Sequence, residues 1–142
     1  MAAIPITFMD TVDEMLRLSM SAHMMQPNPM KILVVEDDPF VRGMAVTQLE
    51  EAGFEVVEAA DGEHALKLLQ AGTVIDLLLT DVRMPGANGW EVAKAYRDRF
   101  PDLPVVYVTG YAEQVEPVSG GIIIQKPYKM SQVIGLLNSW PP

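Results

Sequence analysis

Cysteine is absent from this 142-residue chain, and histidine occurs only at His23 and His64. The first absence excludes disulfides and thiolate chemistry, and two histidines argue against a zinc site. Basic residues are also scarce, since 10 Lys and Arg face 19 Asp and Glu for a formal net charge of −9. That balance argues against DNA or RNA as the main partner, because binding to phosphate backbones depends on clustered Lys and Arg.

Long apolar runs are missing too. None approaches the roughly 18 residues that a membrane span needs, and Asp10, Asp13 and Glu14 stand where a signal peptide has its apolar stretch. We therefore expect a soluble, cytoplasmic protein with no membrane contact. The 49% of apolar residues is too high for a disordered polyanion, and the length suits one globular domain of the usual roughly 100–200 residues.

The first 29 residues form a leader of different composition, rich in Met and ending in the breaker Gln26–Pro29. Thr11–Glu14 fits a helix capping box, and Val12, Leu16 and Met20 recur at a four-residue spacing. The pattern predicts a short amphipathic helix followed by a Pro-rich linker, and a disordered tail is an equal alternative. A role of the leader in homodimerisation stays open.

Short apolar runs alternate with helical patterns from Met30 onward. The runs are too short for helices and rich in Val, Ile and Leu, which is typical of buried parallel strands. The predicted strands are Lys31–Val35, Phe54–Ala59, Ile75–Thr80, Val105–Thr109 and Ile122–Ile124.

The first two helical patterns have recognisable ends. Asp38 is expected to cap the first, with Pro39 in its first turn and Gly53 after its end. Asp61 is expected to cap the second, which Gly72 terminates. The predicted inward face of the first helix consists of Val41, Met44, Ala45, Leu49 and Ala52.

Two more helices are predicted, over 89–99 and after a cap at Ser131. Between the last two strands, Pro117 and Gly120-Gly121 leave room for only about one or two turns, so a helix there is shortened. Strands alternating with helices predict an α/β fold with a doubly wound parallel sheet of five strands. In such folds the site lies at the carboxyl ends of the strands.

Chemically active side chains end four of the five predicted strands. Glu36 and Asp37 follow the first strand and Asp81 follows the third, so these carboxylates should meet and raise each other's pKa. A divalent cation with oxygen ligands, as Mg²⁺ prefers, would relieve the repulsion. Because Thr109 ends the fourth strand and Lys126 follows the fifth, the set predicts a phosphoryl site with a carboxylate as nucleophile.

Five motifs in this order resemble the receiver domain of response regulators, the CheY-like family. They are KILVVEDDP (31–39), LTDVRMPG (79–86), Asn88-Gly89, VTGY (108–111) and QKPY (125–128). The resemblance covers Met30 to about Trp140 and places a receiver domain at 30–142. It implies a flavodoxin-like strand order 2-1-3-4-5 with a shortened fourth helix.

The resemblance implies that Asp81 is the phosphoacceptor, receiving its phosphoryl group from a histidine kinase or histidine phosphotransfer protein. Thr109 matches the hydroxyl that moves to the phosphoryl group, and Lys126 matches the lysine that pairs with it. The Lys126-Pro127 peptide bond is expected to be cis. Such a domain takes part in phosphoryl transfer without being an enzyme. Whether it also dephosphorylates itself, by hydrolysis of its own aspartyl phosphate, stays open.

The implied Mg²⁺ ligands are Glu36, Asp37, Asp81 and the backbone carbonyl of Arg83. Asp37 is expected to bind the ion directly and Glu36 through water. An added phosphoryl group brings negative charge to existing carboxylates. Mg²⁺ and Lys126 are therefore expected to be in place before transfer.

Two features depart from the family pattern. Ile123 occupies the position, three before Lys126, where the family usually has a switching aromatic. The shortened fourth helix removes part of the usual output face, so signalling is expected to work by ordering a loop. The run Tyr107–Tyr111 resembles a subgroup of single-domain regulators with a Thr-Gly-Tyr signature.

The favoured interpretation is a stand-alone receiver that signals through protein contacts. A phosphorylation-independent pseudo-receiver, a binding module with an inactive site, is the main alternative. An aspartyl phosphatase would carry a second acid two residues after its nucleophile, where this chain has Arg83. A flavin carrier would need a hydroxyl-rich loop after the first strand, which here is acidic.

Overall fold

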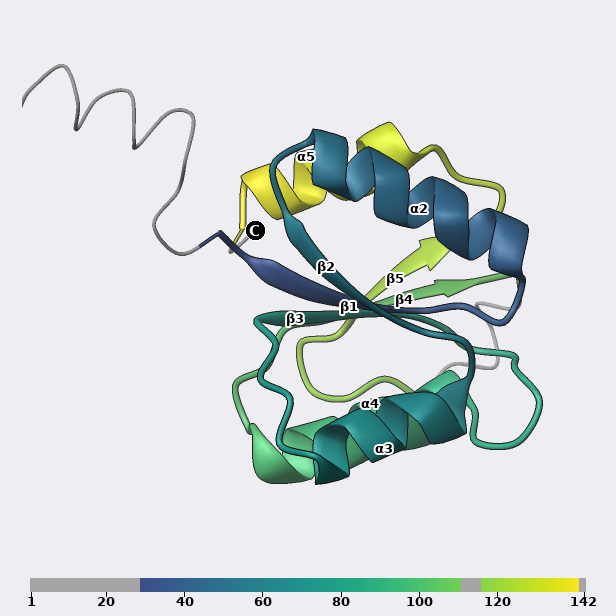
Figure 1. Ribbon diagram of the computed structural model, residues 1–142, viewed down its shortest axis with the longest axis vertical. Coiled ribbons are helices and arrows are strands. Elements are labelled where there is room, and N and C mark those ends of the chain that lie inside the picture. The colour runs from purple at the N-terminus through teal and green to yellow at the C-terminus, as the bar shows by residue number, and fades with distance from the viewer. Residues whose placement is uncertain (1–28, 111–115, 141–142) are drawn as a thin grey trace, which may run out of the picture.

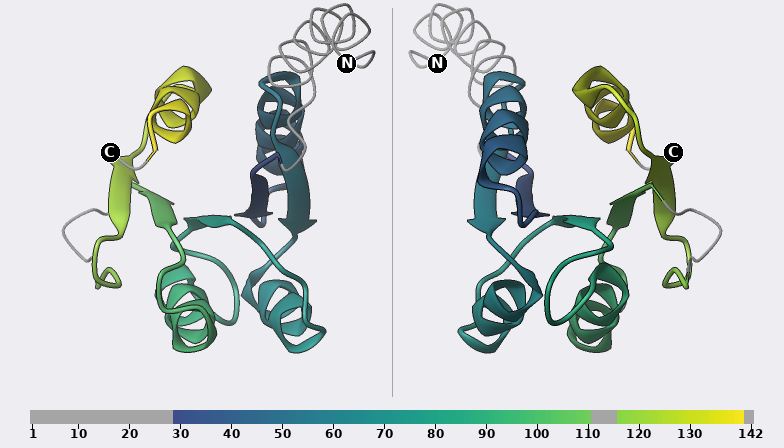
Figure 2. Two further views of the ribbon diagram at one scale, coloured as in Figure 1. Left: turned by 90° about the vertical axis from the view of Figure 1, so that its left-hand side faces the viewer. Right: turned by 90° about the vertical axis from the view of Figure 1, so that its right-hand side faces the viewer.

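The computed structural model describes residues 29–110 and 116–140. One parallel sheet has the strand order β2-β1-β3-β4-β5, with α2 and α5 on one face and α3 and α4 on the other (Figure 1, Figure 2). The predicted doubly wound fold and its flavodoxin-like order are therefore confirmed. The elements are β1 (Lys31–Val35), α2 (Pro39–Glu51), β2 (Glu55–Ala59), α3 (Gly62–Gln70), β3 (Leu77–Asp81), α4 (Gly89–Arg99), β4 (Val105–Thr109), β5 (Ile122–Gln125) and α5 (Met130–Asn138).

The sheet separates two apolar cores because successive side chains along a strand point to opposite faces. In β1, Leu33 packs with the α3 and α4 layer, whereas Ile32 and Val34 pack with the α2 and α5 layer. Every residue of β3 and β4 is buried. β3 and β4 are therefore covered on both faces, and the polar groups at their ends are held in place by the packed strands.

Three helices begin at the caps that local chemistry provides. The Asp38 carboxylate accepts hydrogen bonds from the N–H groups of Phe40 and Val41, as its predicted capping role requires. The Asp61 carboxylate likewise accepts from the N–H of His64. At the start of α4, Asn88 and Glu91 form a reciprocal capping box.

Two predictions about the helices are wrong. Ser131 does not cap α5, which begins at Met130 because the Gln132 side chain accepts the Lys129 N–H at 2.8 Å and so satisfies the first turn. Ala52, which was predicted to face inward, is exposed because it is the cap residue after the last turn of α2. Val41 and Met44 do not face the core either, since 37% and 49% of their surface is exposed. They instead line a groove between α2 and the segment after β5.

The connection from β4 to β5 carries no helix within residues 116–121, which are loop and turn. The remainder of the predicted short helix, at 111–115, lies outside the described residues, as does the predicted helix in the leader. In the parts of the chain that the structure describes, no helix is both long and apolar enough to span a bilayer.

Candidate functional site

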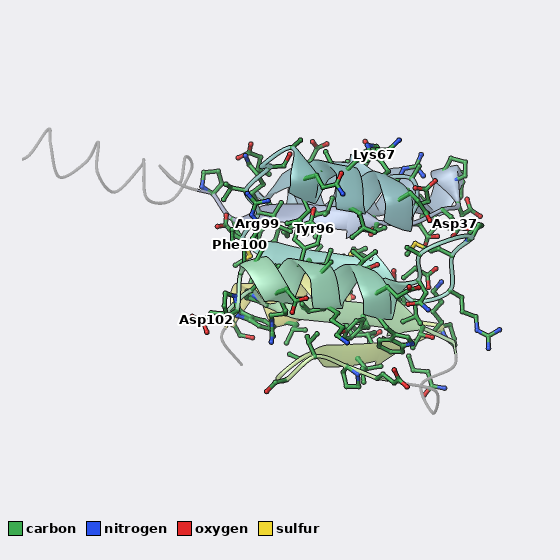
Figure 3. All side chains as sticks on the ribbon, turned by 90° about the horizontal axis from the view of Figure 1, so that it is seen from below. Asp37, Lys67, Tyr96, Arg99, Phe100 and Asp102 are labelled. Atoms are coloured by element: carbon green, nitrogen blue, oxygen red, sulfur yellow. The ribbon has the colours of Figure 1, made fainter. Side chains whose placement is uncertain are left out.

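Three carboxylates meet at the carboxyl edge of the sheet. Glu36 and Asp37 follow β1, Asp81 is the last residue of β3, and one oxygen from each lies within 4.8 Å of the others. Asp37 is exposed, whereas Glu36 and Asp81 are buried. Figure 3 shows Asp37 at the end of the molecule opposite Arg99 and Asp102. The structure thus brings together the acids that the sequence predicted to converge.

Asp81 is held by contacts to each of its carboxylate oxygens. Oδ1 accepts the N–H of Val82 at 2.7 Å, and Oδ2 accepts a hydrogen bond from Lys126 Nζ at 3.0 Å. The main chain is fixed as well, because the Thr80 hydroxyl donates to the Asp81 carbonyl at 2.8 Å. A Cβ atom at Gly89 would collide with that same carbonyl, so α4 starts this close to the site only because residue 89 is glycine.

Glu36 is buried next to these charges. Its Oε2 accepts the N–H of Asp38 at 3.1 Å, and its Oε1 lies 4.0 Å from Lys126 Nζ. Burial raises the Glu36 pKa from 4.5 to about 7, and the nearby Asp81 charge adds to the rise. The Asp38 N–H bond and the Lys126 charge lower the pKa without cancelling the effect of burial.

Lys126 joins two strand ends. Its backbone N–H donates to the Thr109 carbonyl at 2.8 Å, and its side chain reaches Asp81 on β3. Burial lowers the Lys126 pKa, but the hydrogen bond and charge of Asp81 outweigh burial, so the net pKa is raised. The ammonium therefore stays charged at neutral pH. The Lys126-Pro127 bond is cis, as predicted.

The other predicted site residues lie at the same edge. Thr109 is fully buried at the end of β4. The strand β4 lies beside β3 and pairs Val108 with Asp81, so Thr109 is one residue beyond the partner of Asp81. Arg83 follows Asp81 by two residues, and its side chain is exposed. The predicted ligand from Arg83 is its backbone carbonyl.

The donor set fits Mg²⁺. Three carboxylates within 4.8 Å supply the oxygen ligands that this ion prefers. Burial is the main cause of the raised pKa of Glu36, and the neighbouring Asp81 charge adds to it, so a bound cation would favour the ionised form of Glu36. Glu36, Asp37 and Asp81 are the side chains placed to hold the ion.

Sequence reasoning missed one residue that supports this arrangement. The Arg42 guanidinium donates from Nη1 to the Glu36 carbonyl at 2.8 Å and from Nε to Glu58 on β2 at 3.0 Å. It therefore fixes the turn between β1 and α2 against the neighbouring strand. The only signal in the sequence was the position of Arg42 one helical turn after the Asp38 cap.

The site and fold together match a known family. Residues 32–137 match the response regulator receiver domain. The chain belongs to this family. It is thus a receiver domain of two-component signalling, with the acidic pocket at which receivers bind Mg²⁺.

Individual relatives span several kinds of receiver-containing protein. The chain is 42% identical over 90 residues to the transcriptional regulatory protein CpxR of Escherichia coli K12, covering 63% of this chain and 38% of CpxR. It is 37% identical over 83 residues to the sensor kinase CckA of Brucella abortus, covering 58% of this chain and 9% of that kinase. The chain therefore spans well under half the length of these curated relatives.

Solved receivers share the fold. The receiver domain of the hybrid histidine kinase CckA is 36% identical with a TM-score of 0.67, covering 76% of this chain and 95% of that domain. The response regulator TrrA of Thermotoga maritima, in complex with Mg²⁺ and BeF, is 30% identical with a TM-score of 0.68 and covers 77% of this chain and 96% of its own.

Proposed function

We propose that Asp81 accepts a phosphoryl group from the phosphohistidine of a histidine kinase or a histidine phosphotransfer protein. The observation that carries this proposal is the position of Asp81 between the Lys126 ammonium and two further carboxylates that could hold a cation. Lys126 Nζ lies 3.0 Å from Oδ2 of Asp81, and Glu36 and Asp37 each have a carboxylate oxygen within 4.8 Å of an Asp81 oxygen. An isolated buried carboxylate would have neither the ammonium nor the metal ligands that phosphoryl chemistry needs.

The transfer step is a displacement at phosphorus. A carboxylate oxygen of Asp81 forms the new P–O bond while the P–N bond to the donor imidazole breaks, and the imidazole nitrogen keeps the electron pair and takes up a proton. The Lys126 ammonium then neutralises charge on the phosphoryl oxygens. The buried Thr109 hydroxyl at the neighbouring strand end is the donor for a further phosphoryl oxygen.

Glu36, Asp37, Asp81 and the Arg83 carbonyl are the proposed Mg²⁺ ligands. When bound, Mg²⁺ supplies the positive charge that makes a dianionic phosphoryl group tolerable beside three carboxylates. The Asp38 N–H and the Arg42 guanidinium hold Glu36 in place for this role.

A protein donor fits the surface beside the site. The described residues include four large exposed apolar side chains, and three of them, Phe40, Val41 and Met44, lie at the start of α2. Val41 and Met44 border a groove that continues to Lys126 and Tyr128. A phosphohistidine can reach Asp81 only if its protein covers this edge, and an exposed apolar patch there is typical of a protein contact. We assign the α2 patch (Phe40, Val41, Met44) to donor binding.

The test is phosphoryl uptake with Mg²⁺ and acetyl phosphate, followed by intact mass. The wild type and an Asp102→Asn control, changed at an exposed carboxylate at the opposite end of the molecule (Figure 3), should gain one phosphoryl group. Asp81→Asn, or removal of Mg²⁺ with a chelator, should abolish the gain. A folded wild type that takes up no phosphoryl group from acetyl phosphate or a phosphorylated kinase would favour the pseudo-receiver instead.

We also propose that residues 30–142 form the receiver and that the leader 1–29 lies outside it. The family match over 32–137 supports this boundary. A fragment starting at Met30 should therefore fold and take up phosphoryl as the whole chain does. Comparing the masses of both by light scattering tests whether the leader mediates a homodimer.

A further inference from the structure

Tyr107 on β4 binds the connection that leads to β5. Its side chain is fully buried, and its hydroxyl accepts the backbone N–H of Val118 at 3.0 Å. Its ring also lies against Trp90 at the start of α4, with 4.6 Å between ring centroids and a tilt of 58°. Tyr107 therefore joins the sheet, α4 and the loop that follows β4.

The loop is shaped to receive this ring. Residues 118–121 form a tight turn in which the Gly121 N–H donates to the Val118 carbonyl at 2.9 Å. Gly120 has φ 73°, which suits the third position of a type II turn. A Cβ atom on Gly121 would lie 2.9 Å from Cε2 of Tyr107, so the ring and the turn touch because residue 121 has no side chain.

Within the described residues 116–123, two features that are usual in this region are absent. A crossover between parallel strands normally carries a helix, but residues 116–121 carry none. Ile123 pairs with Tyr107 across β4 and β5 and brings no aromatic ring to that position. Of these two paired positions, the one on β4 carries the aromatic ring and the one on β5 does not.

A short chain of contacts connects Tyr107 to the phosphorylation site. Tyr107 is two residues before Thr109 on the same strand. The Thr109 carbonyl accepts the Lys126 N–H at 2.8 Å, and Lys126 Nζ binds Asp81 at 3.0 Å. A rearrangement of Lys126 and Thr109 around a phosphoryl group would therefore act directly on the end of the strand that carries Tyr107.

We infer that Tyr107 is a positioning residue that holds the turn 118–121 against the sheet in the unphosphorylated protein and releases it when Asp81 carries a phosphoryl group. The inference rests on the proposed function of Asp81. The bond has an ordinary length of 3.0 Å, so a shift of the strand end would disturb its geometry and weaken it. A neutral hydrogen bond contributes little net stability, which makes this one reversible. The released turn is the loop whose order changes with phosphorylation.

Amide hydrogen exchange of peptides covering 116–121 tests the inference, without ligand and with Mg²⁺ and beryllofluoride as the phosphoryl probe. In the wild type, the Val118 amide should be protected without the probe and exchange roughly fivefold faster with it. Tyr107→Phe removes only the hydroxyl, so its Val118 amide should exchange fast in both states. The difference between the states should disappear, while phosphoryl uptake at Asp81 continues.

Tyr96→Phe is the matched control. Tyr96 is also fully buried, and its hydroxyl donates a single hydrogen bond to the Ala65 carbonyl at 2.9 Å, between α4 and α3. The Tyr96→Phe variant loses one buried hydrogen bond, as Tyr107→Phe does, but it should keep the wild-type exchange response at 116–121. If both variants lose the response, general loosening of the core explains it and the inference is wrong.

Gly121→Ala gives a second, independent perturbation. The added methyl pushes the turn away from the Tyr107 ring, so exchange at 116–121 should be fast in both states. An unchanged response in either Tyr107→Phe or Gly121→Ala would overturn the inference. A wild type that takes up phosphoryl but shows no response at the turn would also overturn it and leave the proposed function intact. If the mass spectrum of the wild type shows no phosphoryl uptake, it is the proposed function of Asp81 that fails, and this is known before the turn is measured.

Discussion

The ammonium of Lys126 lies 3.0 Å from Oδ2 of Asp81, one of the three carboxylates that meet at the edge of the sheet. Lys126 also approaches Glu36, at 4.0 Å. The lysine thus compensates the same carboxylates that Mg²⁺ would compensate. In the proposed reaction both cations are needed, but before the reaction they compete electrostatically.

Lys126→Met should separate these two effects. Without the ammonium, the carboxylates attract Mg²⁺ more strongly, and affinity should rise by about fivefold, as expected for one partly solvated charge. Phosphoryl uptake should fall by at least roughly tenfold, because charge on the phosphoryl oxygens loses a partner. Calorimetric Mg²⁺ titration and intact mass measure the two quantities.

The control is Lys129→Met, a change at an exposed lysine close by in the sequence. It should leave both Mg²⁺ affinity and uptake near their wild-type values. Weaker Mg²⁺ binding in Lys126→Met would mean that the lysine organises the ligands rather than competing with the ion.

Glu36 should make stability depend on pH. Its pKa is about 7 in the folded chain against 4.5 ordinarily. Between these values the folded chain keeps a proton that the unfolded chain has released, so the free energy of unfolding falls as pH rises, by at most about 1.4 kcal/mol per unit. Urea unfolding across this range checks the slope.

Glu36→Gln removes this titration, so the variant should lose less stability than the wild type as pH rises from about 5 to about 7. Mg²⁺ should restore stability to the wild type at the upper pH, since it binds the ionised form. Equal slopes in the two proteins without Mg²⁺ would show that Glu36 ionises normally.

Much of the fold could be predicted because buried parallel strands are nearly continuous apolar runs. Lys31–Val35 and Val105–Thr109 were predicted to the residue. The third strand was predicted from Ile75 but begins at Leu77, since Ile75 is buried without belonging to the ladder. The hydrophobic pattern shows which residues are buried, but it does not show which of them pair with a neighbouring strand.

The convergence of the site was also predictable, because parallel strands place their carboxyl ends at one edge. What the sequence did not reveal depends on contacts between distant segments. Nothing local indicates that Tyr107 binds Val118, or that Arg42 reaches the carbonyl of Glu36. The exposure of Met44 was missed for the same reason, since it depends on how the segment after β5 lies beside α2.

Gly89→Ala should damage the site through the main chain. The new methyl group collides with the Asp81 carbonyl and crowds Val82, so α4 or the end of β3 must move. We expect a loss of about 1–3 kcal/mol in the free energy of unfolding, as for other overpacked sites, together with weaker Mg²⁺ binding. Urea unfolding and Mg²⁺ titration measure these effects.

The comparison is Gly43→Ala, inside α2. A Cβ atom there meets nothing within 4 Å, so this change should instead stabilise the chain by about 0.5–1 kcal/mol through helix propensity. If Gly89→Ala proves as harmless as Gly43→Ala, close approach of α4 to Asp81 is not needed for the site.

Phe40→Ala should impair transfer from a protein but not from a small molecule. Phe40 is 74% exposed at the start of α2 and contributes little to the core, so folding and uptake from acetyl phosphate should stay at wild-type levels. Transfer from a phosphorylated histidine phosphotransfer protein that serves the wild type should slow by roughly fivefold or more, as expected when an interface aromatic is truncated.

The control is Val74→Ala, which alters another exposed apolar residue just before β3, at the amino ends of the strands. This change should affect neither rate. Equal slowing by both variants would show that exposed apolar surface in general, rather than the α2 patch, governs the encounter.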